Sequence, residues 1–397
     1  MFDNLDLPDA AELSISEYAT LAHKTNQLNT EKETLLDLPM LGFLGEAGSL
    51  LSAVKKQKRD ELPHQRYRET VREEVGDFLW YLSLIAATSR VSLEEVARNT
   101  AKMKIETDGA LRFIDLDNQF ALSRRPPIER LISQLTALGG DVGKFADWHA
   151  HNRRNITPDV VAGHLSPILR QLLRACAAAD VRLHDAAYYN LHKIYDRWPL
   201  TRKRYPDLYD ATHEDKTEQL PRKVEIRIEQ RAKRGKFYVF QTCRDINIGD
   251  PLTDNISDPD FYRFHDVFHY AYASVLGWSP VTRALFKLKR KSDPELDENE
   301  DGARAILVEE GLSTIIFNQA KAQRFFEDIE RGELSFDLLK TVRDFVRGYE
   351  VESAPLWLWE EAILSGYECF RFLKEKKSGI AVCDMKKRRI QMKELTG

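Results

Sequence analysis

The chain has 397 residues, of which 43% are hydrophobic and 31% charged, and its formal net charge is −4. This length exceeds one ordinary hydrophobic core, so roughly two or three domains are expected. The near-neutral charge gives no reason to expect direct nucleic-acid binding, and no run approaches the roughly 18 apolar residues of a membrane span. Four scattered cysteines without CxxC spacing, and an acidic start without a targeting pattern, predict a reducing, cytoplasmic location.

The first two hundred residues show the apolar spacing of helices and no strand pattern. Helices are expected near 15–27, 35–58, 64–89, 92–106, 128–151, 159–179 and 184–198. A charged connection around 115–127, stiffened by its prolines, is expected to be irregular. This half is therefore predicted to be all-α, with a first module at 1–112 and a second module at 113–210.

The pattern changes after 212–221. VEIRIEQ and KFYVFQTC read as two strands joined by RAKRG, which predicts a β-hairpin, and IAVCD with RIQM indicates another hairpin near the end. Between them, helices are expected near 261–276, 281–289, 303–327, 336–351 and 356–374. Residues 222–397 are therefore predicted to form a mainly helical α+β domain.

Two of the predicted helices carry polar residues that interrupt apolar faces. LGFLGEAGSLLSAVKK places Glu46 and Ser49 one turn apart, and VREEVGDFLWYL places Glu74 and Asp77 one turn apart. Because charged residues are rarely buried without partners, two packed helices would aim these side chains at one pocket. The plainer interpretation, acids on a solvated helix surface, fits an isolated ExxD motif equally well.

A pocket of this kind suits a hard cation. Mg²⁺ prefers carboxylate, water and phosphate oxygens, and Mn²⁺ takes similar ligands. Phosphoryl chemistry requires mainly positioning and charge neutralisation, which acids, a metal ion and nearby lysines such as Lys55 would supply. Glu46, Ser49, Glu74 and Asp77 are therefore candidate ligands for a Mg²⁺ ion.

At this point a family resemblance is evident over roughly residues 10–110. The strings YATLAHKTNQ, LGFLGEAGSLLSAVKKQKR and VREEVGDFLWYLSLIAATSRVSLEEVARNTAKMK resemble the MazG-like all-α NTP pyrophosphohydrolases. The family signature is ExxE on one helix, ExxD on the next, and Asn followed by Lys on the last. The matching residues here are Glu46 with Ser49, Glu74 with Asp77, and Asn99 with Lys102.

The resemblance implies hydrolysis of an NTP or dNTP to the monophosphate and pyrophosphate, with Mg²⁺ bound by the acids. Glu46, Glu74 and Asp77 would then be catalytic, and Asn99, Lys102 and Lys55 would bind the nucleotide. Family modules commonly pair, so a homo-oligomer is expected. Ser49 departs from the family carboxylate and supplies no charge, which leaves Glu73 as a nearby acid that could compensate.

A second stretch is similar to the first. NLHKIYDRWP at 190–199 resembles the end of a MazG-like module, and LGGDVGKFADWHAHNRR parallels LGFLGEAGSLLSAVKKQKR, so residues 128–199 are interpreted as an internal repeat. Asp141 and Lys144 replace Glu46 and Ser49, and the ExxD positions fall near Leu165 and Ile168. We therefore predict that the second module has lost the chemistry and acts as an architectural partner.

The C-terminal half carries a histidine pair in FYRFHDVFHYAYASVLGW. His265 and His269 are four residues apart on one face of a predicted helix, a spacing with which two imidazoles share a transition metal. Glu309 and Glu310 follow on another helix, and two histidines with one carboxylate suit Zn²⁺ or Fe²⁺. His265, His269 and Glu310 are thus candidates for a second metal site. The plainer interpretation is a buried pair hydrogen-bonded to Asp266 or Asp301.

Three functions remain open on these grounds. The first is a Mg²⁺-dependent nucleotide pyrophosphohydrolase with an additional C-terminal domain. The second is a nucleotide-binding or oligomerisation scaffold whose C-terminal His/Glu metal site carries the catalysis, which the serine at position 49 favours. The third is a nucleotide sensor without catalysis.

Overall fold

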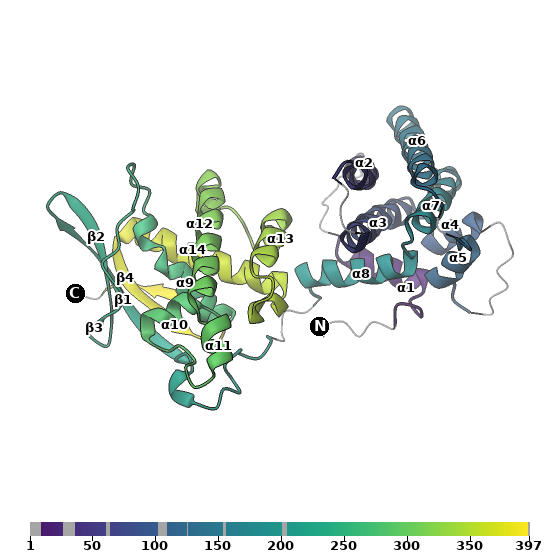
Figure 1. The fold of residues 1–397 in the computed structure, drawn as a ribbon. Coiled ribbons are helices and arrows are strands. Elements are labelled where there is room, and N and C mark those ends of the chain that lie inside the picture. Colours follow the sequence, from purple (N-terminus) through teal and green to yellow (C-terminus); the bar gives the residue numbers. More distant parts are fainter. Residues whose placement is uncertain are drawn as a thin grey trace. The chain divides into compact units, whose positions relative to one another are not determined.

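The computed structural model describes residues 9–26, 36–60, 64–101, 109–124, 126–153, 156–200 and 205–395. The chain divides into two compact units, residues 2–200 and residues 201–397 (Figure 1). The N-terminal unit is helical in its described residues, and the C-terminal unit combines helices with one antiparallel sheet. The predicted fold class is confirmed. No described helix has the length and apolar character needed to cross a membrane.

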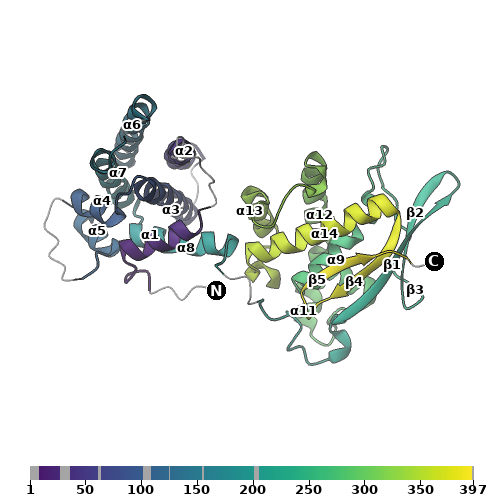
Figure 2. The same ribbon diagram turned by 180° about the vertical axis from the view of Figure 1, so that it is seen from behind.

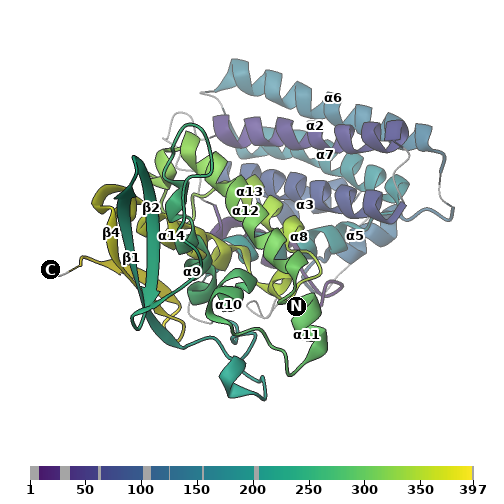
Figure 3. The same cartoon turned by 60° about the vertical axis from the view of Figure 1, so that its left-hand side comes forward.

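The helices of the N-terminal unit lie close to their predicted positions. They are α1 (Ile15–Lys24), α2 (Asp37–Asp60), α3 (His64–Thr88), α4 (Leu93–Thr100), α5 (Phe113–Phe120), α6 (Ile128–Asn152), α7 (Pro158–Ala179) and α8 (Leu183–Arg197). Figure 3 shows the four long helices α2, α3, α6 and α7 side by side. A single buried core runs through both modules, so they fold around shared apolar contacts rather than around two separate cores.

The short helix α5 was not predicted, because its segment was expected to be irregular. Phe113 and Leu116 are buried, and the Asp117 carboxylate accepts hydrogen bonds from the backbone N–H groups of Leu183 (2.8 Å) and His184 (3.0 Å). These two N–H groups open α8 and have no partner within that helix. The acid that caps α8 thus comes from a distant part of the chain, which local spacing cannot show.

The last helix of each module packs against the other module. Helix α8 of the second module lies along α3, and α4 of the first module lies along α7, while α2 packs against α6. The two modules therefore exchange their last helices. Whatever side chains α8 carries on this face meet the Glu74 and Asp77 helix of the first module.

The C-terminal unit is built on one five-stranded sheet. Its strands are β1 (Lys223–Lys233), β2 (Lys236–Cys243), β3 (Ile246–Asn247), β4 (Ser378–Asp384) and β5 (Arg389–Lys393), in the order β3-β2-β1-β4-β5. Both predicted hairpins are confirmed, and they join through antiparallel pairing of β1 with β4, from Lys223 opposite Asp384 to Glu229 opposite Ser378. This joining was not predicted, because the two strands are far apart in the chain.

Helices cover the sheet on one side. They are α9 (Asp266–Val275), α10 (Pro280–Phe286), α11 (Pro294–Asn299), α12 (Ala303–Ala322), α13 (Phe336–Phe345) and α14 (Leu356–Lys376), with short 3-10 turns at Lys216–Glu218, Tyr262–Phe264, Arg324–Phe326 and Glu350–Ser353. Helices α9 and α14 pack on each other and on β4 and β5, as Figure 2 shows. Helix α11 was not predicted. Trp278 and Trp359 are fully buried in this layer.

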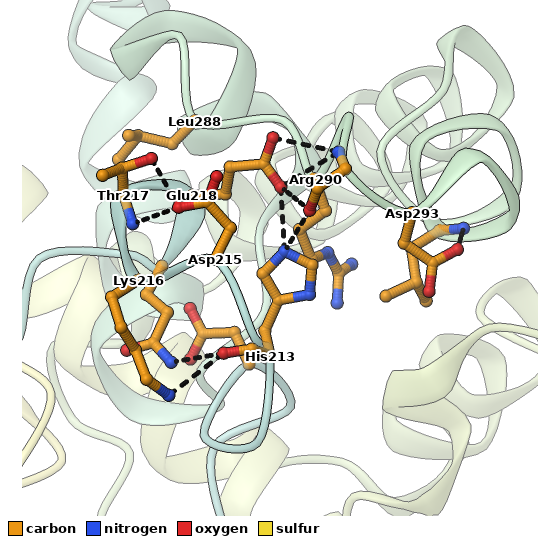
Figure 4. Close-up of polar contacts among 12 residues, drawn as sticks. His213, Asp215, Lys216, Thr217, Glu218, Leu288, Arg290 and Asp293 are labelled. Atoms are coloured by element: carbon orange, nitrogen blue, oxygen red, sulfur yellow. Dashed lines mark hydrogen bonds and ion pairs between the residues drawn. The ribbon is translucent and has the colours of Figure 1, made fainter.

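The segment before β1 is tied to the unit by a polar cluster (Figure 4). His213 Nε2 lies 2.8 Å from Glu218 Oε2 and 3.1 Å from Ser292 Oγ, and the Ser292 hydroxyl donates to the same carboxylate. In a catalytic Ser–His–acid triad the hydroxyl and the acid occupy opposite ring nitrogens. Here both occupy Nε2, so the cluster fastens the segment and is not a nucleophile triad.

A buried ion-pair network also holds this unit together, and it gives a stability prediction. Both oxygens of Asp301 accept from Arg290, at 2.8 and 3.0 Å, and Arg290 also pairs with Glu350. Asp301→Asn is expected to lower the free energy of unfolding by about 3 kcal/mol. The substitution removes the charge of Asp301 and leaves the buried Arg290 poorly compensated. Hydrogen exchange of peptides covering α11 and α12 would measure this.

The exposed pair Arg324–Glu327 provides the control. Glu327→Gln should change the unfolding free energy by less than about 1 kcal/mol, since exposed ion pairs contribute little. Equal effects of the two substitutions would contradict the role assigned to the buried network.

Candidate active site

Three acids of the first module lie together. Glu46 comes from α2 and Glu74 and Asp77 from α3, and one carboxylate oxygen from each falls within 4.8 Å of the others. All three side chains are half-buried between the packed helices. Carboxylates at this spacing and in this environment favour a cation among them. The geometry therefore brings together the acids that the sequence singled out.

The other two polar candidates of these helices differ from the acids. Ser49 is half-buried one turn beyond Glu46 on α2, where it offers a neutral hydroxyl. Glu73 accepts a hydrogen bond of 2.8 Å from the ammonium of Lys193, and it is not one of the three acids that cluster. The cluster of the first module is thus built from three carboxylates rather than four.

Asn190 and Lys193 of α8, in the second module, contact the acids of the first module. Asn190 is buried and its Nδ2 donates to Asp77 Oδ1 at 3.0 Å, while Lys193 Nζ lies 2.5 Å from Asp77 Oδ2. Burial alone would lower the pKa of Lys193, but the Asp77 and Glu73 carboxylates raise it above its usual value. Lys193 therefore stays a cation beside the acids. The second module, predicted to be an architectural partner, thus places two polar side chains against the acid cluster.

Tyr18 of α1 fixes the orientation of the asparagine. Its hydroxyl donates to Asn190 Oδ1 at 3.0 Å, so the amide must turn its nitrogen toward Asp77. Burial, and then the charge of Asp77, raise the pKa of Tyr18 well above its usual value, which keeps the hydroxyl a donor. Tyr18, Asn190 and Asp77 form one chain of hydrogen bonds across three helices.

Gly76 lets α8 come this close to α3. A Cβ atom at this position would lie 2.8 Å from Asn190 Cβ and 2.9 Å from the carbonyl oxygen of Ala186, and contacts this short do not occur without movement. The glycine between Glu74 and Asp77 is therefore explained by the packing of the second module on the first.

Gly76→Ala should destabilise the N-terminal unit by about 1–3 kcal/mol, because overpacking outweighs the better helix propensity of alanine. Gly48→Ala on α2 is the matched control, since a Cβ there meets nothing within 4 Å, and it should be neutral or stabilising by up to about 1 kcal/mol. Hydrogen exchange of α3 peptides would report the difference. A stabilising Gly76→Ala would contradict the close approach.

Asn99 of the first module does not lie at the acids. It is exposed on α4, which packs against α7, and its backbone carbonyl accepts from Arg170 of that helix at 3.2 Å. Helix α4 lies along α7 of the second module, where Leu165 and Ile168 are buried at the positions that correspond to Glu74 and Asp77. Asn190 is the asparagine that contacts the acids, and the nucleotide-binding role of Asn99 stays a prediction. Lys102 lies outside the described residues.

Lys55 is also placed away from the acids. It follows Glu46 by nine residues on α2, or about 13 Å along the axis and on the opposite face of a regular helix. There it lines an apolar pocket with Val54 and with Ile132 of α6. Lys55 is therefore not part of the acid cluster, and its contact with a nucleotide stays a prediction.

In the C-terminal unit the structure brings the predicted histidine pair and Glu310 together. His265 precedes α9, His269 lies on α9, and Glu310 lies on α12, with its Oε2 3.8 Å from His265 Nε2 and 3.5 Å from His269 Nε2. Asp301, which the plainer interpretation offered as a partner of the histidines, instead pairs with arginines.

The N-terminal unit thus defines a class of protein: an all-α bundle of paired modules with a carboxylate cluster suited to a divalent cation. Residues 37–107 match the model of the MazG nucleotide pyrophosphohydrolase domain, and residues 204–396 match that of the MazG C-terminal domain. The chain is a MazG-like protein with a C-terminal domain of this family, which identifies the half that the sequence left unassigned. Comparisons with curated proteins and with solved structures give no match.

Proposed function

We propose that the N-terminal unit hydrolyses a nucleoside triphosphate, NTP or dNTP, to the monophosphate and pyrophosphate with Mg²⁺, or Mn²⁺ in its place. One observation carries this proposal: Glu46, Glu74 and Asp77 converge within 4.8 Å inside a domain of the matching family. Oxygen ligands from two adjacent helices fit the donor preference of Mg²⁺. The second module adds an amide and an ammonium group at the same place.

The reaction adds water across the bond between the α and β phosphates, and the bridging oxygen leaves with pyrophosphate. Bound Mg²⁺ supplies activation of the water and neutralisation of charge on the phosphates. Glu46, Glu74 and Asp77 would hold the cation, and the proton lost by the water would pass to one of the carboxylates around it. A half-buried site strengthens each of these electrostatic interactions relative to bulk water.

Asn190 and Lys193 act by positioning. Both oxygens of Asp77 are engaged by these two side chains, so the carboxylate cannot rotate freely. Lys193 also bridges Asp77 to Glu73, which fixes α8 on α3 and keeps a positive charge beside the phosphate site. Ordering of this kind reduces the reorganisation needed during phosphoryl transfer.

The proposal is tested with the full chain and a panel of ribo- and deoxyribonucleoside triphosphates, assayed for pyrophosphate and monophosphate. Turnover with Mg²⁺ or Mn²⁺, abolished by a chelator and restored by the metal, is expected for at least one nucleotide. Orthophosphate as the released product, or no turnover across the panel with either metal, would exclude the proposed hydrolysis. Nucleotide binding without turnover would instead support the sensor.

A further inference from the structure

The histidines of the C-terminal unit are held by their Nδ1 atoms. His265 Nδ1 lies 2.9 Å from the backbone carbonyl oxygen of Tyr262, and His269 Nδ1 lies 2.8 Å from Glu309 Oε1. Each Nδ1 donates to an oxygen, so in the neutral ring the lone pair is on Nε2. A metal-binding histidine typically has this arrangement, in which an oxygen acceptor fixes the tautomer and the orientation of the ring.

The two Nε2 atoms point into the same place. His269 is fully buried, and its Nε2 makes no hydrogen bond within the described chain, although Glu310 Oε2 is 3.5 Å away. His265 Nε2 lies 3.8 Å from the same oxygen and 3.3 Å from Asp266 Oδ1. Ligands about 2.1 Å from a shared tetrahedral ion lie about 3.4 Å apart, close to these separations.

The carboxylates around the histidines are also held in place by hydrogen bonds. Glu309 accepts a hydrogen bond from the Ser279 hydroxyl at 2.6 Å and one from the backbone N–H of Val281 at 2.8 Å. These two bonds hold the carboxylate where its Oε1 also accepts from His269 Nδ1. Asp266 Oδ2 accepts from the amide of Gln241, whose own oxygen accepts from Tyr270 at 2.7 Å. This leaves Asp266 Oδ1 on the side of His265.

The plainer interpretation is a buried histidine pair satisfied by its neighbours, and it leaves one contact long. Glu309 holds Nδ1 of His269, but the fully buried Nε2 faces only Glu310 Oε2 at 3.5 Å, too far for a hydrogen bond of normal length. Glu310 adds a second carboxylate on the side where both Nε2 atoms lie. A cation at this point would satisfy all of these atoms together.

We propose that the C-terminal unit binds one first-row transition-metal ion, of the Zn²⁺ or Fe²⁺ type, through His265 Nε2, His269 Nε2 and Glu310, with Asp266 as a further ligand and Glu309 orienting His269. Two histidines and carboxylates select such ions over Mg²⁺. The Glu310 side chain is 38% exposed, so this carboxylate lies where the site meets the surface. This site is separate from the proposed pyrophosphohydrolase site and does not depend on it.

The test uses the full chain, with metal content measured by mass spectrometry after purification and Co²⁺ added to metal-stripped protein. One equivalent of bound ion and visible cobalt bands that saturate at one equivalent are expected. Glu310→Gln and His265→Asn should weaken cobalt binding by at least about 100-fold, and Glu309→Gln by about 10- to 100-fold. The element found in the purified protein distinguishes zinc from iron.

Two controls separate this site from others. Glu74→Gln alters the acid cluster of the first module, and His213→Asn removes a histidine paired with one carboxylate, so neither should change the cobalt bands. Glu310 is half-exposed, so Glu310→Gln should keep the fold even if His265→Asn does not, and circular dichroism checks both. No cobalt bands in the wild type, or bands that persist in a folded Glu310→Gln protein, would overturn the proposal.

Discussion

Glu46→Gln is expected to lower kcat/KM for pyrophosphate release by about 10³-fold, since it removes a charged ligand from a site that works by electrostatic stabilisation. The carboxylate oxygen of Glu46 lies within 4.8 Å of those of Glu74 and Asp77, and glutamine keeps the size of the side chain while removing its charge. The loss should be partly recovered at high Mn²⁺ if metal affinity is the property that changes.

The repeat offers a matched control for this substitution. Asp141 stands in the second module where Glu46 stands in the first, and it pairs with Lys144 at 3.0 Å. Asp141→Asn should leave kcat/KM within about twofold, because an exposed i,i+3 pair contributes little. A comparable loss in both variants would show that the acid cluster of the first module is not the catalytic one.

Lys193→Met and Asn190→Ala should each reduce kcat/KM by about 10²- to 10³-fold, although both residues belong to the module without the acids. Removal of Lys193 leaves Asp77 and Glu73 without their shared ammonium group, and removal of Asn190 breaks the hydrogen-bond chain from Tyr18 to Asp77. Losses of this size are typical when a positioned donor is removed from a preorganised site. Initial rates at saturating and limiting nucleotide would separate kcat from KM.

Asn99→Ala is the matched control for Asn190→Ala. Asn99 holds the corresponding place on α4 and is exposed, and α4 packs against α7 of the second module. It should leave both kcat/KM and unfolding unchanged, whereas Asn190→Ala should also cost about 2 kcal/mol of stability through two buried hydrogen bonds. If Asn99→Ala lowered kcat/KM and Asn190→Ala did not, the assignment of α8 rather than α4 to the acid cluster would be wrong.

These contacts explain how the two modules differ. The first module retains Glu46, Glu74 and Asp77, and the second retains Asn190 and Lys193 but has Leu165 and Ile168 where acids would stand. Because the last helices are exchanged, the retained residues of both modules meet at one place. Among the described residues, the polar side chains that each module keeps therefore gather in one cluster.

Part of this arrangement was visible in the sequence. The helical spacing of apolar residues predicted the long helices, and the alternation of apolar and polar residues predicted the strands of both hairpins. Both patterns depend only on residues that are close together in the chain. The ExxD motif and Glu46 indicated the acid cluster because these acids interrupt the apolar faces of their helices. The likeness of the segment beginning at Asn190 to the end of a MazG-like module was also visible, and it was the available signal for the asparagine that contacts Asp77.

The remaining features depend on residues that are far apart in the chain. Tertiary packing alone decided that α8 lies on α3, that Asp117 caps α8, and that β1 pairs with β4. It also divided the roles of two adjacent acids, placing Glu309 on His269 Nδ1 and Glu310 beside the two Nε2 atoms. Local periodicity determines which face of an element is apolar, but the partner of that face is chosen by close packing of the whole core.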